Sequence, residues 1–202
     1  MSGNMHSERQ IQKDRSLPFC YISGGCRSGK SAFAQRLAED SAPRRLYIAT
    51  CFADKEDEEM AGRISLHRQA RGAGWRHLEP DEASLPNLAD LLPGLAAPGE
   101  ALLLDCLSLW AASCMCAEKA PHDFDERCDK LLRCLWALPN PVFIVNSEVG
   151  MGLVPQSLAS RTFRDMTGLA GQRAADMATC AIFMVSGLPL VVKGALPALF
   201  DR

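Results

Sequence analysis

The sequence lacks the features that would indicate a membrane protein, a secreted protein or a binder of polyanions. No apolar run approaches the roughly 18 residues that span a bilayer, and residues 1–16 are polar, without the apolar core of a signal peptide. The formal net charge of −2 provides no attraction to nucleic acid or to an anionic membrane. These absences favour a cytoplasmic protein that acts on small molecules.

Cysteine is present, but not in the spacing of a metal site or a redox pair. The nine cysteines include no C-x-x-C pair, and several of them (Cys20, Cys106 and Cys180) lie in apolar runs. We therefore interpret most of them as small core residues in a reducing compartment.

Apolar runs typical of β-strands alternate with helical stretches along the chain. Most of these runs are continuous, which is typical of strands buried on both faces of a parallel sheet. The runs cover 19–23, 45–50, 101–107, 141–147, 180–187 and 188–194. Helices are predicted over 31–40, 57–71, 123–138 and 158–178, with a short helix and a loop within 85–100. We predict an α/β fold with a mainly parallel sheet, formed by a single catalytic domain over 18–202 after a leader over 1–17 that lies outside the fold.

The segment "GGCRSGKS", residues 24–31, fits the phosphate-loop pattern G-x-x-x-x-G-K-S/T in full. An apolar strand precedes it and an Ala-rich helix follows it, a context that a chance match in a Gly-rich turn would rarely have. Glycines let successive backbone N–H groups point at phosphate oxygens, and the helix N-terminus adds its positive dipole end. Lys30 is expected to contact the β- and γ-phosphates and Ser31 to ligate Mg²⁺. The predicted nucleotide contacts are Gly24, Gly25, Cys26, Arg27, Ser28, Gly29, Lys30 and Ser31.

A phosphate loop usually works with an acidic residue at the end of a neighbouring strand, which supports the Mg²⁺ ion. Asp105 follows four apolar residues in "ALLLDC", and Glu148 follows the run in "VFIVNSEVG". Ligands of parallel sheets bind at the carboxyl ends of the strands, where both carboxylates would lie. We favour Asp105 for the metal and keep Glu148 as the alternative.

A third candidate region is the charged stretch "EDEEMAGRISLHRQARGAGWRHLE". Arg63, His67 and Arg71 are spaced i, i+4, i+8, so they would form one row along a helix. His67 also borders an apolar stripe, so spacing alone favours a partly buried structural histidine. The alternative is a neutral imidazole that attacks a phosphorus atom while nearby arginines neutralise phosphate charge.

Taken together, several segments resemble the bifunctional adenosylcobinamide kinase / adenosylcobinamide-phosphate guanylyltransferase family of cobalamin biosynthesis. They are "GGCRSGKSAFAQRLA", "LYIAT", "DEEMAGRISLHRQARGAGWRHLE", "LLLDCLSLW", "VNSEVGMGLVP", "RTFRDMTGLAGQRAA" and "VSGLPL". They occur in family order over about residues 19 to 190. The resemblance implies a RecA-like P-loop NTPase fold, assembly as a homotrimer, and two reactions. The first phosphorylates adenosylcobinamide with ATP or GTP. The second transfers GMP from GTP to adenosylcobinamide phosphate.

The resemblance also implies roles for individual residues. His67 aligns with a histidine that is guanylylated during the second reaction, and Lys30 with the lysine of the phosphate loop. Besides the loop itself, the implied nucleotide contacts are Ala49, Thr50, Cys51, Arg68, Gln69, Ala70, Arg71, Glu79 and Asp105. Mg²⁺ is the implied metal, on Ser31 and Asp105.

The chain departs from the family pattern at a few of these positions. Leu66 precedes His67 where a second histidine is common, and Arg68–Arg71 reads Arg-Gln-Ala-Arg where Lys-Asp-Gly-Arg is frequent. Asp105 stands in place of the usual Glu, and Gly171 in place of a common Asn. Since the loop and His67 are retained, we expect both activities. The competing hypotheses are a P-loop kinase without guanylyl transfer and a nucleotide-binding switch.

Overall fold

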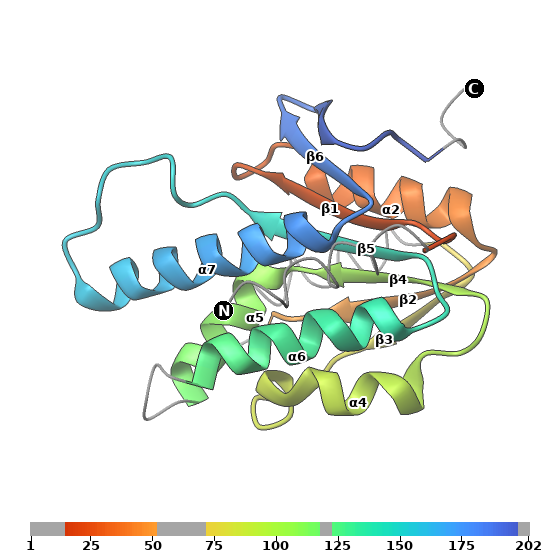
Figure 1. Ribbon diagram of the computed structural model, residues 1–202, viewed down its shortest axis with the longest axis horizontal. Coiled ribbons are helices and arrows are strands. Elements are labelled where there is room, and N and C mark those ends of the chain that lie inside the picture. The colour runs from red at the N-terminus through yellow and green to blue at the C-terminus, as the bar shows by residue number, and fades with distance from the viewer. Residues whose placement is uncertain (1–14, 52–71, 118–122, 198–202) are drawn as a thin grey trace, which may run out of the picture.

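The computed structural model describes residues 15–51, 72–117 and 123–197. Within these ranges it forms one sheet with helices on both faces (Figure 1). The strands are β1 (Phe19–Gly24), β2 (Arg44–Ala49), β3 (Trp75–Leu78), β4 (Glu100–Asp105), β5 (Val142–Ser147), β6 (Cys180–Val185) and β7 (Leu188–Lys193). The helices are α2 (Lys30–Ser41), the 3₁₀ turn η1 (Leu85–Asn87), α4 (Leu88–Leu95), α5 (Leu107–Ala117), α6 (Asp123–Ala137) and α7 (Leu158–Met177).

The sheet is mainly parallel, as the sequence predicts. Its strand order is β3-β2-β4-β5-β1-β6-β7, and the pairs are parallel except β6 with β7. The tight turn before β7 contains Ser186 and Gly187, both with positive φ, and it reverses the chain so that β7 runs antiparallel along the edge of the sheet.

Two apolar cores lie on the two faces of the sheet. Helix α2 packs on one face, while α5, α6 and α7 cover the other (Figure 1). Alternate residues of one strand enter different cores: Ile22 packs with α2, and Tyr21 packs with the helices of the other face. Because both faces are buried, the strands need apolar residues at successive positions, which explains the continuous runs in the sequence.

Two elements are absent from the sequence-based prediction. Helix α5 begins at Leu107, where the predicted strand over 101–107 should still continue. Its sequence "LSLWAASCMCA" is apolar almost throughout, so it lacks the polar face that distinguishes a surface helix from a buried strand. Strand β3 has only four residues, and its sequence "WRHL" contains two polar residues. The helix predicted over 57–71 lies outside the described residues.

The last residues of the predicted leader already pack against the domain. Arg15 donates hydrogen bonds to the backbone carbonyls of Trp136 and Asn140, and its guanidinium lies over the ring of Phe19. Burial lowers the pKa of this guanidinium. Packing against the domain therefore begins no later than residue 15. Among the helices that the structure describes, none is long and apolar enough to cross a membrane.

The parallel pairing brings the carboxyl ends of six neighbouring strands to one edge of the sheet. In register, Gly24 of β1 pairs with Ser147 of β5, and Ala49 of β2 pairs with Asp105 of β4. The phosphate loop follows β1 at this edge, and ligands of parallel sheets bind there.

Candidate active site

The phosphate loop presents a helix N-terminus that no side chain of the loop caps. Gly29, the N-cap of α2, has φ +90, a left-handed conformation that favours glycine. No side chain caps α2 through a hydrogen bond, and its first turn contains no acidic residue. The first backbone N–H groups of α2 have no intrahelical acceptor and remain available to an anion. This is the geometry of a phosphate site.

Two sequence-distant segments hold the loop in place. The Glu148 N–H donates to Gly24 O at 3.0 Å, and the Gly187 N–H donates to Ser28 O at 3.0 Å. The Lys30 ammonium donates to Gly25 O at 3.1 Å, so the lysine is folded back across its own loop. The loop is therefore shaped by β5 and by the β6–β7 turn as well as by its own sequence.

The loop forms one wall of a pocket of about 790 Å³ at the carboxyl edge. The other walls come from the end of β4 with the start of α5, from the end of β5, and from α7. Its lining residues are Cys26, Arg27, Ser28, Gly29, Lys30, Ser31, Ala32, Cys106, Ser108, Leu109, Ser147, Glu148, Val149 and Phe163. The loop and Glu148 are predicted from the sequence, whereas Cys106, Ser147 and Phe163 reach the pocket through the packing of β4, β5 and α7.

Cys106 is a neutral thiol at this pocket. Burial raises its pKa, the Asp105 carboxylate adds to the rise, and the Lys30 ammonium partly opposes it. Since the thiolate is the reactive form of cysteine, Cys106 contributes a packing surface to the pocket and is poorly suited as a nucleophile.

The two acidic candidates occupy different surroundings. Asp105 ends β4 on the sheet face covered by α2, since Ala101 and Leu103 of the same strand belong to that core. Its Oδ2 accepts a hydrogen bond from the Tyr47 hydroxyl at 3.2 Å. Glu148 lines the pocket directly, and its Oε1 accepts the Gly150 N–H at 2.6 Å. Glu148 is thus engaged within its own loop, whereas Asp105 is held by a single phenol.

The oxygens at this edge fit a Mg²⁺ ion that is held mainly by phosphates. Ser31 lies in the first turn of α2 and is partly exposed, and Asp105 is the carboxylate predicted to join it, whereas Glu148 is the one that lines the pocket. The structure shows no cluster of three or more His, Cys, Asp or Glu side chains able to hold a metal within the part of the chain that it describes. Mg²⁺ typically needs only one or two protein oxygens when it is bound together with a nucleotide.

The remaining predicted contacts that the structure describes are spread along the same edge. Thr50 is buried, and its hydroxyl donates to Cys106 O at 2.7 Å and accepts from the Cys106 N–H at 2.6 Å. This side chain therefore ties the end of β2 to the end of β4. Ala49 and Cys51 flank Thr50, and Glu79 is exposed just beyond β3. Four strand spacings, about 19 Å across the sheet, separate β3 from β1, so Glu79 follows a strand far from the phosphate loop.

The candidate nucleophile and its flanking residues are not placed. His67, Arg68, Gln69, Ala70 and Arg71 lie outside the described residues. Their predicted roles stay predictions.

Close packing explains the glycine at position 171 of α7. A Cβ at Gly171 would lie 2.6 Å from the Tyr21 hydroxyl oxygen and 3.0 Å from Nδ2 of Asn146. Those two side chains are hydrogen-bonded to each other at 2.9 Å. A side chain at position 171 would not fit without a shift, because Tyr21 and Asn146 fill the space beside the helix.

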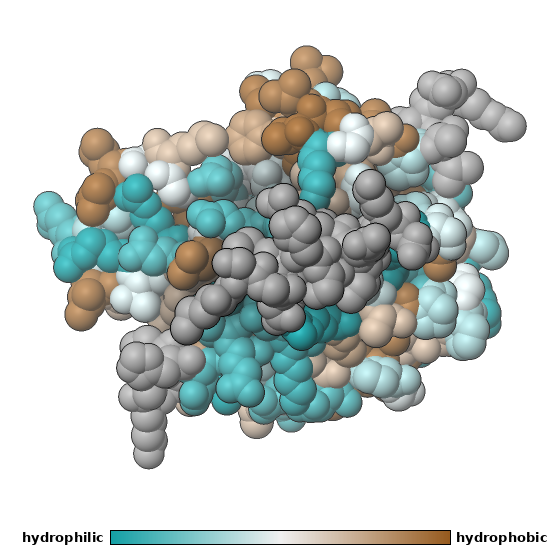
Figure 2. Space-filling model, viewed as in Figure 1, coloured by the Kyte–Doolittle hydropathy of each residue, from teal (hydrophilic) through white to brown (hydrophobic). Residues whose placement is uncertain are grey.

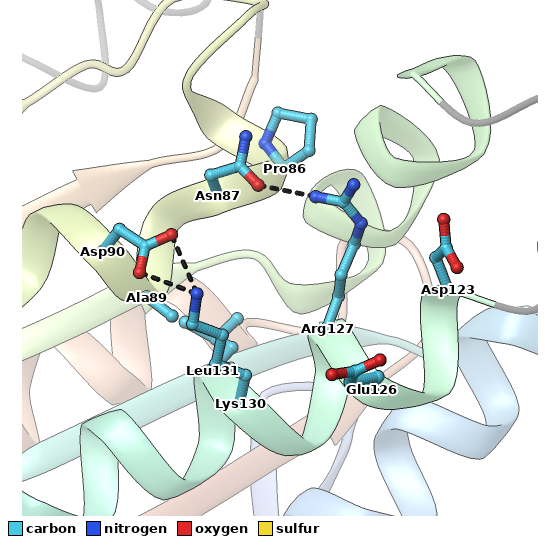
Figure 3. A pocket seen from close by; sticks show the side chains of 9 residues that line it. All are labelled: Pro86, Asn87, Ala89, Asp90, Asp123, Glu126, Arg127, Lys130 and Leu131. Atoms are coloured by element: carbon cyan, nitrogen blue, oxygen red, sulfur yellow. Dashed lines mark hydrogen bonds and ion pairs between the residues drawn. The ribbon is translucent and has the colours of Figure 1, made fainter.

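A second hollow lies away from this edge, between η1–α4 and α6 (Figure 3). It encloses about 250 Å³, and its basic side chains are already paired. Lys130 forms an ion pair with Asp90 at 2.7 Å, and Arg127 donates to Asn87 Oδ1 at 2.6 Å. Figure 3 shows both pairs bridging the hollow. They connect α6 to η1 and α4, and the carboxylates of Asp123 and Glu126 also line the hollow.

Comparison with known proteins identifies relatives over nearly the whole chain. Residues 20–192 match the family model described as cobinamide kinase / cobinamide phosphate guanyltransferase. A bifunctional adenosylcobalamin biosynthesis protein of Pseudomonas aeruginosa is 41% identical over 173 residues, covering 86% of this chain and 96% of that protein. One from Salmonella typhimurium is 35% identical over 184 residues, covering 85% and 98%.

Solved structures show the fold. The RadB recombinase superposes with a TM-score of 0.50 at 15% sequence identity, covering 83% of this chain and 74% of that one. At this identity the likeness concerns the fold alone. It confirms the expected RecA-like P-loop architecture.

Proposed function

The chain belongs to the cobinamide kinase / cobinamide phosphate guanyltransferase family, and we propose that it catalyses both reactions at the carboxyl edge of its sheet. It phosphorylates adenosylcobinamide with a nucleoside triphosphate, and it then transfers GMP from GTP to the resulting phosphate. The observation that carries this proposal is the uncapped N-terminus of α2 at a large pocket, in a chain that matches the family over residues 20–192.

In the kinase step, the loop holds the triphosphate while the acceptor hydroxyl attacks. The backbone N–H groups of the loop and the Lys30 ammonium would contact the β- and γ-phosphates, where charge develops as the γ-phosphoryl group leaves. The substrate oxygen forms a bond to the γ-phosphorus and loses its proton to solvent, the bond to the β-phosphate oxygen breaks, and the nucleoside diphosphate is released. Such positioning and charge stabilisation account for most of phosphoryl-transfer catalysis.

In the transferase step, we assign the nucleophile to His67. Its neutral imidazole attacks the α-phosphorus of GTP, and pyrophosphate leaves. A phosphate oxygen of adenosylcobinamide phosphate then attacks the same phosphorus and releases His67. The covalent intermediate divides one difficult displacement into two easier ones. Arg68 and Arg71 would neutralise phosphate charge on either side.

Ser31 and Asp105 would hold Mg²⁺ at this site, with Glu148 as the alternative carboxylate. The ion would neutralise charge on the phosphate oxygens. ATP and GTP both serve as candidate phosphate donors of the first step. Gly24, Gly25, Cys26, Arg27, Ser28 and Gly29 are the proposed loop contacts. Ala49, Thr50, Cys51, Gln69, Ala70 and Glu79 are proposed to complete the nucleotide site along the edge of the sheet.

We further propose that the protein works in the cytoplasm as a homo-oligomer, a trimer by the family resemblance, with residues 18–202 as the catalytic domain. Apolar side chains gather over the corner formed by β6 and β7 (Figure 2). Leu188 and Val192 of the edge strand β7 are 72% and 68% exposed. An exposed apolar edge strand is a surface that proteins usually cover, which supports an interface between copies of the chain.

The two reactions are tested by following the corrinoid product. With purified protein, adenosylcobinamide, ATP, GTP and Mg²⁺, the expected products are adenosylcobinamide phosphate and then adenosylcobinamide-GDP, separated by chromatography. Accumulation of the phosphate alone would indicate a kinase without guanylyl transfer. Absence of any turnover that depends on adenosylcobinamide would indicate a nucleotide-binding switch.

A further inference from the structure

A third pocket, which we call the α7 pocket, opens beneath α7 on the sheet face opposite α2. It encloses about 330 Å³ between α7 and the ends of β1 and β5. Ser147, Glu148 and Val149 line both this pocket and the one at the phosphate loop. A ligand that occupies the α7 pocket would therefore extend toward the bound triphosphate.

Three buried polar atoms at the α7 pocket have no hydrogen-bond partner among the described residues. They are Oδ1 of Asn146, Oγ1 of Thr167 and Nη1 of Arg164. Asn146 and Thr167 are only 3% and 2% exposed. The amide of Asn146 has one polar atom on the Tyr21 hydroxyl, so the other stays unpaired whichever way the amide is turned. Unpaired buried polar groups are costly, and three around one pocket indicate a polar ligand.

The charges around the pocket favour a neutral ligand over an anion. Glu148, which lines the same pocket, provides a carboxylate opposite in sign to the Arg164 guanidinium. The guanidinium donates, the amide oxygen of Asn146 accepts, and the Thr167 hydroxyl can do either. A ligand that pairs with all three groups needs a carbonyl oxygen to accept from Arg164 and N–H groups to donate to Asn146 and Thr167. A carboxamide has both.

Two glycines of α7 line the pocket. Gly171 has no side chain, and the Tyr21–Asn146 hydrogen bond passes beneath it. Gly168, one turn earlier on the same helix, also lines the pocket, and a Cβ there would meet nothing within 4 Å. The helix therefore presents the polar side chains of Arg164 and Thr167 to the pocket, followed by two glycines.

We propose that the α7 pocket binds a carboxamide side chain of the corrinoid substrate and so positions the acceptor hydroxyl beside the phosphate loop. This subsite rests on the proposed function, because a cobinamide carries acetamide and propionamide side chains around its ring. Arg164 donates to the amide oxygen, and Asn146 and Thr167 bind the amide N–H groups. These three are substrate-positioning residues and take no part in bond making.

The variant Thr167→Val tests the proposal with little change in side-chain shape. Removing a hydroxyl that has no partner in the protein should not lower thermal stability. The dissociation constant for adenosylcobinamide, measured by equilibrium dialysis with its visible absorbance, should rise about tenfold. The affinity for GTP should stay within about twofold, since the nucleotide occupies the other pocket. Thr162→Val, on the same helix but lining neither pocket, is the matched control and should change neither affinity.

A second variant, Arg164→Met, removes the donor at a partly exposed position, and it should also weaken corrinoid binding about tenfold. Unchanged corrinoid affinity in both variants would overturn the subsite, and so would an equal loss of GTP affinity. If the variants bind adenosylcobinamide with normal affinity and still phosphorylate it, the subsite is refuted and the proposed function is supported. Tight, Thr167-dependent binding without phosphorylation would leave the subsite standing and refute the kinase assignment.

Discussion

Tyr21 occupies the space beside Gly171, where an added Cβ would come within 2.6 Å of its hydroxyl oxygen. The phenol in turn accepts a hydrogen bond from the buried Asn146 amide at 2.9 Å. This contact is part of the packing of α7 against β1 and β5.

Gly171→Ala is expected to destabilise the fold although alanine is the better helix former. Overpacking of this kind costs about 1–3 kcal/mol. Gly168→Ala is the matched control on the same helix, since its Cβ would meet nothing within 4 Å, and it should stabilise by about 0.5–1 kcal/mol. Urea unfolding measures both. A double variant with Tyr21→Phe should recover part of the Gly171→Ala loss, and equal stability of the two single variants would contradict the contact.

Lys30 is expected to matter for both reactions, because each begins from a nucleotide held by the same loop. Loss of one such stabilising group typically lowers kcat by about 10²- to 10³-fold. We expect Lys30→Met to do so for phosphorylation and for guanylyl transfer while leaving the melting temperature nearly unchanged. Lys193→Met is the control: Lys193 also donates to backbone carbonyls, those of Ala175 and Asp176, but lies outside the pocket. A normal rate in Lys30→Met would remove the loop from the mechanism.

Asp105 and Glu148 can be separated by their effect on Mg²⁺ dependence. Because Glu148 is bonded to Gly150 N–H within its own loop, we expect Asp105 to be the main carboxylate at the metal. Asp105→Asn should raise the Mg²⁺ concentration for half-maximal activity by about tenfold, and Glu148→Gln should change it by less. The opposite order would assign the metal to Glu148.

The ion pair between Glu100 and Arg76 makes the free energy of unfolding depend on pH under acidic conditions. Glu100 is almost fully buried and accepts two hydrogen bonds from the Arg76 guanidinium, each 2.8 Å long. Arg76 holds the pKa of this carboxyl below its ordinary value of 4.5, against the effect of burial. A lowered pKa in the folded state stabilises the protein above the unfolded pKa, and this stabilisation is lost as the pH falls through the folded pKa.

Glu100→Gln should therefore destabilise the protein at neutral pH by about 1–3 kcal/mol, less than a fully buried pair would because Arg76 is half exposed. The difference in melting temperature between wild type and variant should shrink as the pH falls below the ordinary carboxyl pKa of 4.5. Thermal melts at a series of pH values measure it. A difference that stays constant over that range would exclude Glu100 as the titrating group.

Most strands of the sheet and the phosphate loop of the site could be predicted from the sequence because they depend on local patterns. The phosphate loop is a contiguous motif, and strands buried on both faces have continuous apolar runs. Helix α5 was not predictable in this way, because its uniformly apolar sequence has neither helical nor strand periodicity.

The α7 pocket depends on packing between segments far apart in the chain. Asn146 ends a strand, while Arg164 and Thr167 lie on a helix some twenty residues later. The helix sequence does contain a signal, since Arg164, Thr167 and Gly171 recur at spacings of three and four and fall on one face. Only the docking of α7 on β1 and β5 shows that this face meets Tyr21 and Asn146.

The most direct test of bifunctional catalysis is a covalent-labelling experiment with GTP labelled in its α-phosphate. Wild-type protein incubated with this GTP and Mg²⁺, without corrinoid, should acquire label through an acid-labile bond. Addition of adenosylcobinamide phosphate should move the label into adenosylcobinamide-GDP. His67→Ala should acquire no label while still phosphorylating adenosylcobinamide. Label that persists in His67→Ala, or a wild-type protein that is never labelled, would contradict the account.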